Sequence, residues 1–320
     1  MAGTALEFAT ISELASQIRA GALNPVKLAE TTLDRVAALN PRLHAFISVT
    51  RERALAEAQA ADILLRRGHD LGPLHGVPYA VKDLYNVAGL PTTAGTRLLA
   101  GNVVTRDAAV VRRLAAAGMV LVGKTYTVQF AFGGVGINHD QGTPHNPWHA
   151  TPHAPGGSSS GSGVAVGAGL VPMALGSDTG GSVRIPAALC GTVGLKTTVG
   201  RISRADVYPL SWTLDSVGPL TRSVEDAALA IPGMIVRQLE DRLGPGACRT
   251  PESLLAAVRR LAQIGVGEVE IAFSPGQLEE IAHRARRNNR TVEQELQWIV
   301  RRLEDDLFHG GTPRGIVGRI

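Results

Sequence analysis

The chain has 320 residues, of which 44% are hydrophobic and only 4% aromatic, and its formal net charge at pH 7 is +4. This length allows one large or two modest domains, and the small net charge gives no sign of a nucleic-acid-binding surface. No run approaches the length of a membrane-spanning helix. Because the N-terminal segment lacks the basic start and apolar core of a secretory signal, and the two cysteines have no metal-like spacing, we expect a cytoplasmic protein.

Helix and strand signals alternate in the first third of the chain. Residues 10–13, Thr-Ile-Ser-Glu, have the form of a capping box, and Asn24 before Pro25 has the form of an N-cap with proline in the first turn. Amphipathic helices are predicted after both signals. The alternation predicts a sheet covered by helices. The further elements predicted here are a helix over 51–67, a buried strand over 77–83, a helix over 107–118 and a buried strand over 119–125.

The middle of the chain has a different texture. Residues 133–163 are rich in glycine, proline, serine and histidine and predict a long loop, which inside a compact domain is often functional. Regular structure then resumes, and 172–178 is predicted to be a strand that leads into a double glycine followed by a serine. A further strand is predicted within 191–203 and a helix over 223–231.

Three short patterns match known sites but lack the required context. Residues 118–125 satisfy the Walker pattern, but the apolar Met-Val-Leu-Val between the glycines belongs inside a strand rather than in a phosphate loop. Residues 157–161 satisfy the nucleophile-elbow pattern, yet no strand precedes them. His145, His149 and His153 have metal-like helical spacing, but the prolines around them exclude a helix. We therefore predict neither a nucleotide site nor a zinc site.

Three longer motifs occur together and in a fixed order. They read GVPYAVKDLYNVAGLPTTAGT from residue 76, PGGSSSGSG from residue 155 and LGSDTGGSVRIPAALCGTVGLKTTVGRIS from residue 175. Together they resemble the amidase signature family, over about residues 5–231. The resemblance implies an α/β fold with a mixed sheet covered by helices. That family generally continues into a second half that completes the sheet, so the fold expected here is a shortened form.

The resemblance also implies a serine nucleophile with a lysine base. The family's nucleophile falls on Ser182, its lysine on Lys82, and its bridging serine, which follows a cis peptide bond, on Ser158. The chemistry is consistent with these residue types, because a serine hydroxyl needs a neighbour to take its proton and burial favours a neutral lysine. The implied reaction is hydrolysis of an amide through an acyl-enzyme, with release of ammonia or an amine. No metal or organic cofactor is implied.

The double glycine has a predicted role beside the nucleophile. Glycines let the main chain approach a substrate closely, and main-chain amides can stabilise a developing oxyanion. A helix that starts near Ser182 adds positive potential at its N-terminus. Asp178 and Arg184 are expected to hold this turn rather than to contact the substrate. The predicted oxyanion donors are the main-chain amides of Thr179, Gly180, Gly181 and Ser182.

A shift in composition predicts a domain boundary near residue 233. The segment 234–320 holds 13 arginines and 12 acidic residues and is richer in charge than 1–233. It is predicted to be a small, mainly helical module with a strand over 268–275 and two helices that follow. This order of elements resembles a ribbon-helix-helix module over about 268–308.

The second resemblance implies a homodimer and raises the question of DNA. In that family the outward-facing strand residues enter the major groove, and the matching positions here are Glu268, Glu270 and Ala272. Two carboxylates there would face a polyanion. Dimerisation without DNA is therefore the favoured interpretation of this segment.

Two hypotheses for function result. In the first, the protein is an amidase, a hydrolase of carbon–nitrogen bonds in linear amides other than peptides, and acts on a small-molecule amide. In the second, it is a dimeric amidase-like binding protein that is catalytically weak or inactive and is linked to DNA through the C-terminal module. The joint presence of Lys82, Ser158 and Ser182 favours the first hypothesis, whereas the shortened fold favours the second.

Overall fold

The computed structural model describes residues 6–234 together with 286–287. The chain divides into two compact units, Met1–Ile235 and Val236–Ile320, and the architecture below is that of the first. The module predicted for the C-terminal segment, including its ribbon-helix-helix resemblance and its dimer strand, lies outside the described residues.

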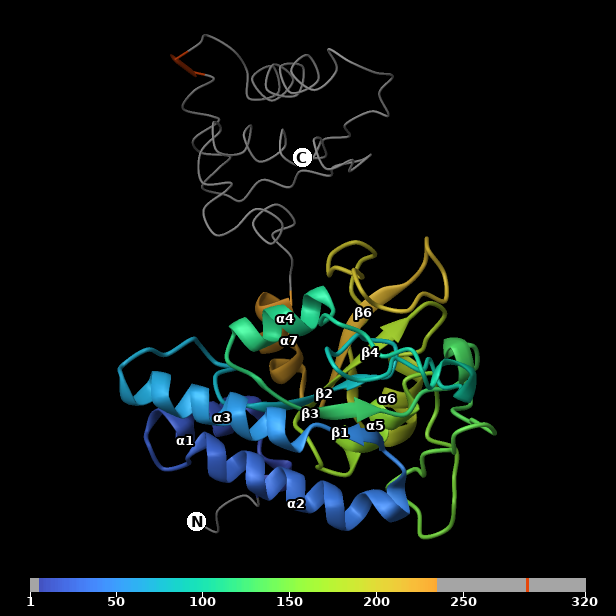
Figure 1. Ribbon diagram of the computed structural model, residues 1–320, viewed down its shortest axis with the longest axis horizontal. Coiled ribbons are helices and arrows are strands. Elements are labelled where there is room, and N and C mark those ends of the chain that lie inside the picture. The colour runs from blue at the N-terminus through green and yellow to red at the C-terminus, as the bar shows by residue number, and fades with distance from the viewer. Residues whose placement is uncertain (1–5, 235–285, 288–320) are drawn as a thin grey trace. The chain divides into compact units, whose positions relative to one another are not determined.

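The first unit contains a six-stranded mixed sheet. Its strands are β1 (Phe46–Val49), β2 (Pro78–Lys82), β3 (Val120–Thr125), β4 (Met173–Asp178), β5 (Val193–Gly194) and β6 (Ser216–Thr221). Their order across the sheet is β1-β3-β2-β4-β6-β5 (Figure 1). The central strand β2 is parallel to both of its neighbours, β3 and β4, whereas β1, β6 and β5 pair in antiparallel fashion. The carboxyl ends of β2, β3 and β4 therefore meet at one edge of the sheet.

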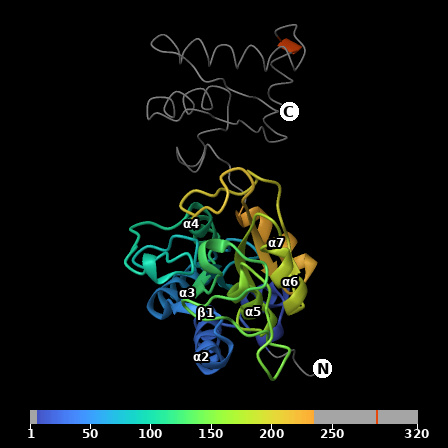
Figure 2. The same cartoon turned by 90° about the vertical axis from the view of Figure 1, so that its right-hand side faces the viewer.

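Helices cover both faces of this sheet. They are α1 (Ile11–Arg19), α2 (Pro25–Leu43), α3 (Arg51–Arg66), α4 (Ala109–Ala116), α5 (Ser160–Gly167), α6 (Arg184–Cys190) and α7 (Val224–Met234), with 3-10 turns at Leu6–Phe8, Arg97–Leu99 and Gln129–Ala131. Figures 1 and 2 show α4 and α7 on one side of the strands and α2 and α5 on the other. The predicted α/β architecture, a sheet covered by helices, is confirmed.

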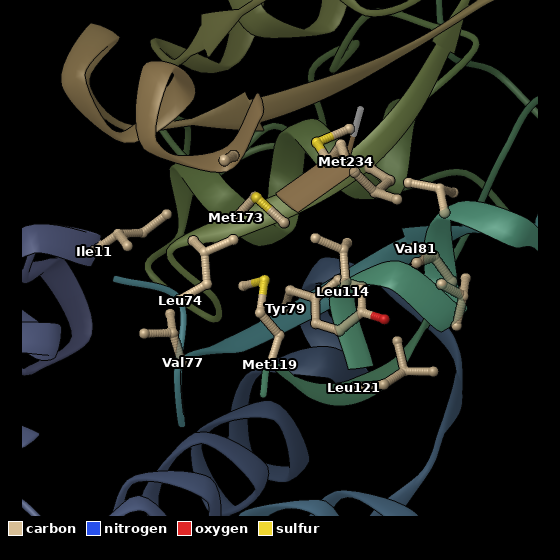
Figure 3. Packing of buried hydrophobic residues seen from close by; sticks show 14 of the residues in the cluster. Ile11, Leu74, Val77, Tyr79, Val81, Leu114, Met119, Leu121, Met173 and Met234 are labelled. Carbon is tan, nitrogen blue, oxygen red and sulfur yellow. The ribbon is translucent and has the colours of Figure 1, made fainter. Parts of the chain in front are cut away.

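Alternation along the strands divides the core into two clusters. Tyr79 and Val81 of β2 pack with α1, α4 and α7, and the residues of this cluster are shown in Figure 3. Ala80, between them, points to the opposite face and packs with α2, α3 and α5. All five residues of β2 are buried. A strand buried on both faces is typical of the centre of an α/β sheet, so Lys82 at its end comes out of a dry core.

The first two helices begin where the sequence predicts. Thr10 accepts a hydrogen bond from the Glu13 N–H at 3.1 Å, and the Glu13 carboxylate accepts the Thr10 N–H at 2.8 Å, which is a complete capping box. Asn24 caps α2 by accepting the N–H groups of Val26 and Lys27, with Pro25 in the first turn. Both caps satisfy amide donors that the helix itself leaves unpaired.

The sequence prediction differs from the structure at three places. The predicted loop ends early, because α5 begins at Ser160, within 133–163. The strand predicted within 191–203 is reduced to the two residues of β5, and strands β1 and β6 were not predicted. No helix among the described residues is long and apolar enough to cross a membrane.

Candidate active site

The residues predicted to form the site come from three separate segments. Lys82 is the last residue of β2, Ser158 precedes α5, and Ser182 lies in the turn between β4 and α6. The peptide bond between Gly157 and Ser158 is cis. Because β2 and β4 are parallel neighbours, their carboxyl ends deliver Lys82 and the turn of Ser182 to the same edge of the sheet.

Lys82 is fully buried and is held by two serine hydroxyls. Its Nζ lies 2.7 Å from Ser158 Oγ and 2.9 Å from Ser177 Oγ. Burial lowers the pKa of Lys82 from 10.5 to about 7, although the carboxylates of Asp215 and Asp178 act in the opposite direction. A large fraction of Lys82 is therefore neutral near pH 7, and a neutral amine can accept a proton.

Main-chain contacts fix the position of Ser158. Its carbonyl oxygen accepts hydrogen bonds from Thr127 Oγ1 at 2.9 Å and from the Val128 N–H at 3.2 Å, and the Gly157 N–H donates to Gly134 O at 2.8 Å. Gly157 leaves no room for a side chain, since a Cβ there would lie 2.8 Å from Gly133 O. The loop that carries Ser158 is thus packed directly against the segment that follows β3.

Ser182 lies beside this loop with a free hydroxyl. Its carbonyl oxygen accepts the N–H of Ser159 at 3.2 Å, so its backbone is next to the residue that follows Ser158. Its side chain makes no hydrogen bond within the described part of the chain, and the residue is partly exposed. The structure therefore joins Lys82 to Ser158 by a direct hydrogen bond and leaves the hydroxyl of Ser182 open to an incoming molecule.

A carboxylate clamp holds the turn of Ser182. Asp178 accepts the N–H groups of Gly181 at 2.8 Å and Val183 at 3.1 Å, and it forms a bidentate pair with the Arg184 guanidinium at 2.9 and 3.0 Å. Although burial opposes it, these bonds hold the pKa of Asp178 below its usual range. The prediction that Asp178 and Arg184 hold the turn is confirmed. Gly181 has φ +135°, and a Cβ there would meet Ile185 Cδ1 at 2.8 Å, so the turn requires glycine.

The clamp reduces the predicted set of oxyanion donors by one. The N–H of Gly181 points to Asp178 and is not directed at a substrate. The amides of Thr179, Gly180 and Ser182 have no acceptor among the described residues. These three donors are the ones that remain available for an anionic oxygen next to Ser182.

Replacing Asp178 by alanine is expected to lower the rate of Ser182 acylation by about two orders of magnitude, because a shift of the turn by about 1 Å is enough for such a loss. Arg184→Ala is the control, since it leaves the amide bonds to Asp178 in place and Arg184 is half exposed. We expect it to lose less than about tenfold. The rates of covalent labelling, with a thermal melt for each variant, check the prediction. An Asp178→Ala rate close to that of the wild type contradicts it.

Sequence reasoning missed two polar residues at this site. Ser177 contacts Lys82 directly, and Asp215 accepts Thr179 Oγ1 at 2.5 Å and the N–H groups of Leu210 and Ser211 at 2.8 and 3.0 Å. Asp215 thereby ties the segment before β6 to the turn after β4. The available signals were weak: Ser177 lies inside a motif whose glycines and Ser182 drew the attention, and Asp215 is a single acidic residue before an unpredicted strand.

A second buried lysine serves a different purpose. Lys124 Nζ lies 2.5 Å from Asp83 Oδ1, with both side chains almost fully buried, and it also donates to Pro91 O at 2.7 Å. Burial lowers the pKa of Lys124, while the neighbouring Asp83 acts to raise it. Lys124 is thus engaged in an ion pair next to the site, in agreement with the structural role predicted for it.

The described residues offer no metal site. No group of three His, Cys, Asp or Glu side chains in 6–234 could hold an ion. His149 and His153 stack on each other at 3.7 Å between ring centroids, whereas His145 lies near His44 instead. The three histidines with metal-like spacing therefore do not converge.

The comparison with known families decides the classification. The family described as Amidase matches residues 27–296, well over half of the chain. The chain belongs to the amidase family. The resemblance to the amidase signature family is thereby confirmed. The match continues past residue 231 into the segment for which a separate module is predicted.

Several relatives are closely similar over the first unit. One is the glutamyl-tRNA(Gln) amidotransferase, in its A-type subunit, of Chloroflexus aggregans: the identity is 47% over 226 residues, covering 71% of this chain and 46% of that protein. Another is the 2-amino-5-chloromuconic acid deaminase of Comamonas testosteroni, with 46% identity over 226 residues, covering 70% and 49%. The chain thus spans about half the length of the curated relatives that it matches.

A solved structure shows the same fold. The native peptide amidase of Stenotrophomonas maltophilia has 35% sequence identity and a TM-score of 0.69, with 97% of this chain and 61% of that chain covered. A second amidase structure has 41% identity and a TM-score of 0.65, covering 71% and 51%.

Proposed function

We propose that this protein is an amidase that cleaves a linear amide through an acyl-enzyme on Ser182. The observation that carries the proposal is the pair of Lys82 and Ser158: a fully buried amine whose pKa lies near 7 and which is hydrogen-bonded at 2.7 Å to a serine hydroxyl. A buried lysine is costly to a fold unless it has a function or a counter-charge. Lys82 has no carboxylate in direct contact among the described residues, in contrast to Lys124.

The arrangement supports a two-step reaction. Lys82 takes the proton of Ser158 while Ser158 takes that of Ser182, and the Oγ of Ser182 attacks the amide carbon. Negative charge on the carbonyl oxygen is stabilised by the free amides of the turn. The carbon–nitrogen bond then breaks as the proton returns through Ser158 to the leaving amine. Water, activated through the same relay, hydrolyses the ester and restores the three side chains.

The substrate that we propose is a small-molecule amide. Relatives are named as a deaminase, a peptide amidase and part of an amidotransferase, so the family match alone does not select one amide. The cytoplasmic location and the homodimer remain predictions from the sequence.

Trapping of the acyl group by hydroxylamine tests the proposed function. The purified full chain is incubated with a panel of aliphatic and aromatic primary amides, with and without hydroxylamine, and ammonia and hydroxamate are measured. An acyl-enzyme predicts that hydroxamate forms at the expense of the acid, and Ser182→Ala gives neither product. Product formation that is equal in Ser182→Ala, or no product from a panel that includes activated anilides, contradicts the proposal.

The acylation rate is expected to rise with pH up to about pH 7. Only neutral Lys82 accepts a proton, so with a pKa of about 7 the active fraction falls about tenfold for each pH unit below that value. The logarithm of the labelling rate should therefore have a slope near one in acid and a plateau above neutrality. A rate that stays constant from pH 5 to 9, or that bends only near pH 10, contradicts a neutral Lys82.

A further inference from the structure

We infer that Ser177 is a positioning residue that directs the amine of Lys82 toward Ser158. Ser177 lies near the end of β4, its side chain is buried, and its Oγ accepts a hydrogen bond from Lys82 Nζ at 2.9 Å. The inference rests on the proposed function, since it concerns the base of that reaction.

The valence of a neutral amine makes this second contact consequential. A neutral lysine has two N–H donors and one lone pair, and the lone pair must point at the Ser158 hydroxyl for Lys82 to act as a base. The N–H groups then point elsewhere, around a fully buried side chain. Ser177 Oγ is the acceptor for one of them, so the bond to Ser177 sets the rotation of the amine and aims the lone pair at Ser158.

The same contact acts on the charged form. When Lys82 becomes an ammonium, Ser177 accepts a charge-assisted hydrogen bond, which stabilises the ammonium and raises its pKa. The other charged groups that act on Lys82 are Asp215 and Asp178, and both remain in place when Ser177 changes. Tyr85, which donates to Gly176 O at 2.6 Å, stays neutral because burial raises its pKa. Loss of the Ser177 hydroxyl should therefore lower the pKa of Lys82.

The position of Ser177 is itself fixed by its main chain. Its N–H donates to Ser159 Oγ at 3.3 Å, and its carbonyl oxygen lies 3.4 Å from the same hydroxyl. Ser159 follows Ser158 directly. The strand that carries Ser177 and the loop that carries Ser158 are thus joined on either side of the amine, which places both hydroxyls at a constant separation around Lys82.

The chain offers a matched control in Ser162. Its hydroxyl is also buried, donates to Leu175 O of the same strand at 2.9 Å and lies 2.7 Å from Thr125 Oγ1, but it does not contact Lys82. Ser162→Ala removes a buried serine hydroxyl bound to β4 without touching the amine. It therefore reports the general cost of such a deletion.

The test combines lysine NMR with covalent labelling on the full chain. The sequence has only four lysines, so a sample with ¹³C-labelled lysine gives four Cε signals, and Lys82→Arg identifies the signal of Lys82. Titration gives its pKa in the wild type, Ser177→Ala, Ser177→Thr and Ser162→Ala. The rate of Ser182 labelling by a fluorophosphonate is measured on the same variants.

We expect Ser177→Ala to lower the pKa of Lys82 by about one unit and the plateau labelling rate by about tenfold or more. Ser177→Thr, which keeps the hydroxyl, should recover most of both, and Ser162→Ala should change neither. Ser177→Cys keeps the side-chain volume but is only a weak acceptor, and it takes the place of alanine where alanine does not fold. An unchanged pKa and rate in Ser177→Ala, or equal losses in Ser162→Ala, overturns the inference.

The two readouts separate the inference from the proposed function. If wild-type Ser182 is not labelled at any pH, the proposed function fails, while the lysine titration still decides whether Ser177 controls the amine. If labelling occurs and the pKa of Lys82 does not respond to Ser177, only the inference fails.

Discussion

Replacing Lys82 by methionine is expected to lower the rate at which Ser182 is acylated by about three orders of magnitude, the scale of a lost general base. The methionine fills most of the lysine volume but has no group that can take the proton of Ser158. Labelling rates at the pH plateau, measured over hours, give the size of the loss.

The conservative replacement should fail as well. Lys82→Arg keeps a positive charge and hydrogen-bond donors, but a guanidinium does not lose its proton in proteins and provides no base. Lys196→Met is the matched control, since Lys196 is exposed and its amine donates to Thr197 O, away from Lys82. A Lys82→Arg variant that acylates within tenfold of the wild type contradicts the role of Lys82 as the base.

Loss of activity in Lys82→Met should not reflect unfolding. Burial lowers the pKa of Lys82, so the unfolded chain binds this proton more tightly than the native state does. The penalty on the free energy of unfolding is fully present below about pH 7 and shrinks as the pH rises toward 10.5. Methionine removes this penalty, and thermal melts at pH 6 should show a stability equal to or above that of the wild type.

Replacing Lys124 by methionine is expected to cost about 3–5 kcal/mol in the free energy of unfolding, because Asp83 then stays buried without its cation. The pair is short, at 2.5 Å, and almost fully buried on both sides. Asp83 keeps only its contacts with the N–H and hydroxyl of Thr93. Urea denaturation of the two proteins measures the difference.

A double variant provides the control for this stability effect. Lys124→Met combined with Asp83→Leu removes both charges, so it should recover a large part of the loss seen in Lys124→Met alone. The amine of Lys82, which does not contact Asp83, should keep its pKa near 7 in a folded double variant. A Lys124→Met protein within about 1 kcal/mol of the wild type contradicts a structural ion pair.

The elements that the sequence predicts well are those with local signals. The cap at Thr10, the cap at Asn24 and the apolar run of β3 each depend on a few neighbouring residues, and each is found in the structure. The apolar run also shows why the Walker pattern has no nucleotide role, since its residues are buried in β3. Local chemistry alone specifies these elements.

The elements that were missed depend on distant partners. Strand β6 contains Gly218 and Pro219, which are poor strand formers, and it is stabilised by pairing with β4, where Pro219 lies opposite Leu175. Strand β1 is only four residues long and lies at the edge of the sheet, where it pairs with β3. No short-range pattern predicts such strands.

The candidate site shows the same division. The motifs identify Lys82, Ser158 and Ser182 as candidates, but spacing along the chain does not reveal that Ser177 and Ser158 both contact the amine, from 95 and 76 residues away. Nor does it reveal that the Gly181 N–H is already bound to Asp178. These features arise only when β2 and β4 lie side by side.

The most direct test of the central claim is to locate the adduct of a fluorophosphonate probe by tandem mass spectrometry, in the wild type and in Lys82→Met. The account predicts a single adduct on Ser182 that forms faster as the pH rises to about 7 and is nearly absent in Lys82→Met. An adduct on another serine, or one on Ser182 that forms equally fast without Lys82, contradicts it.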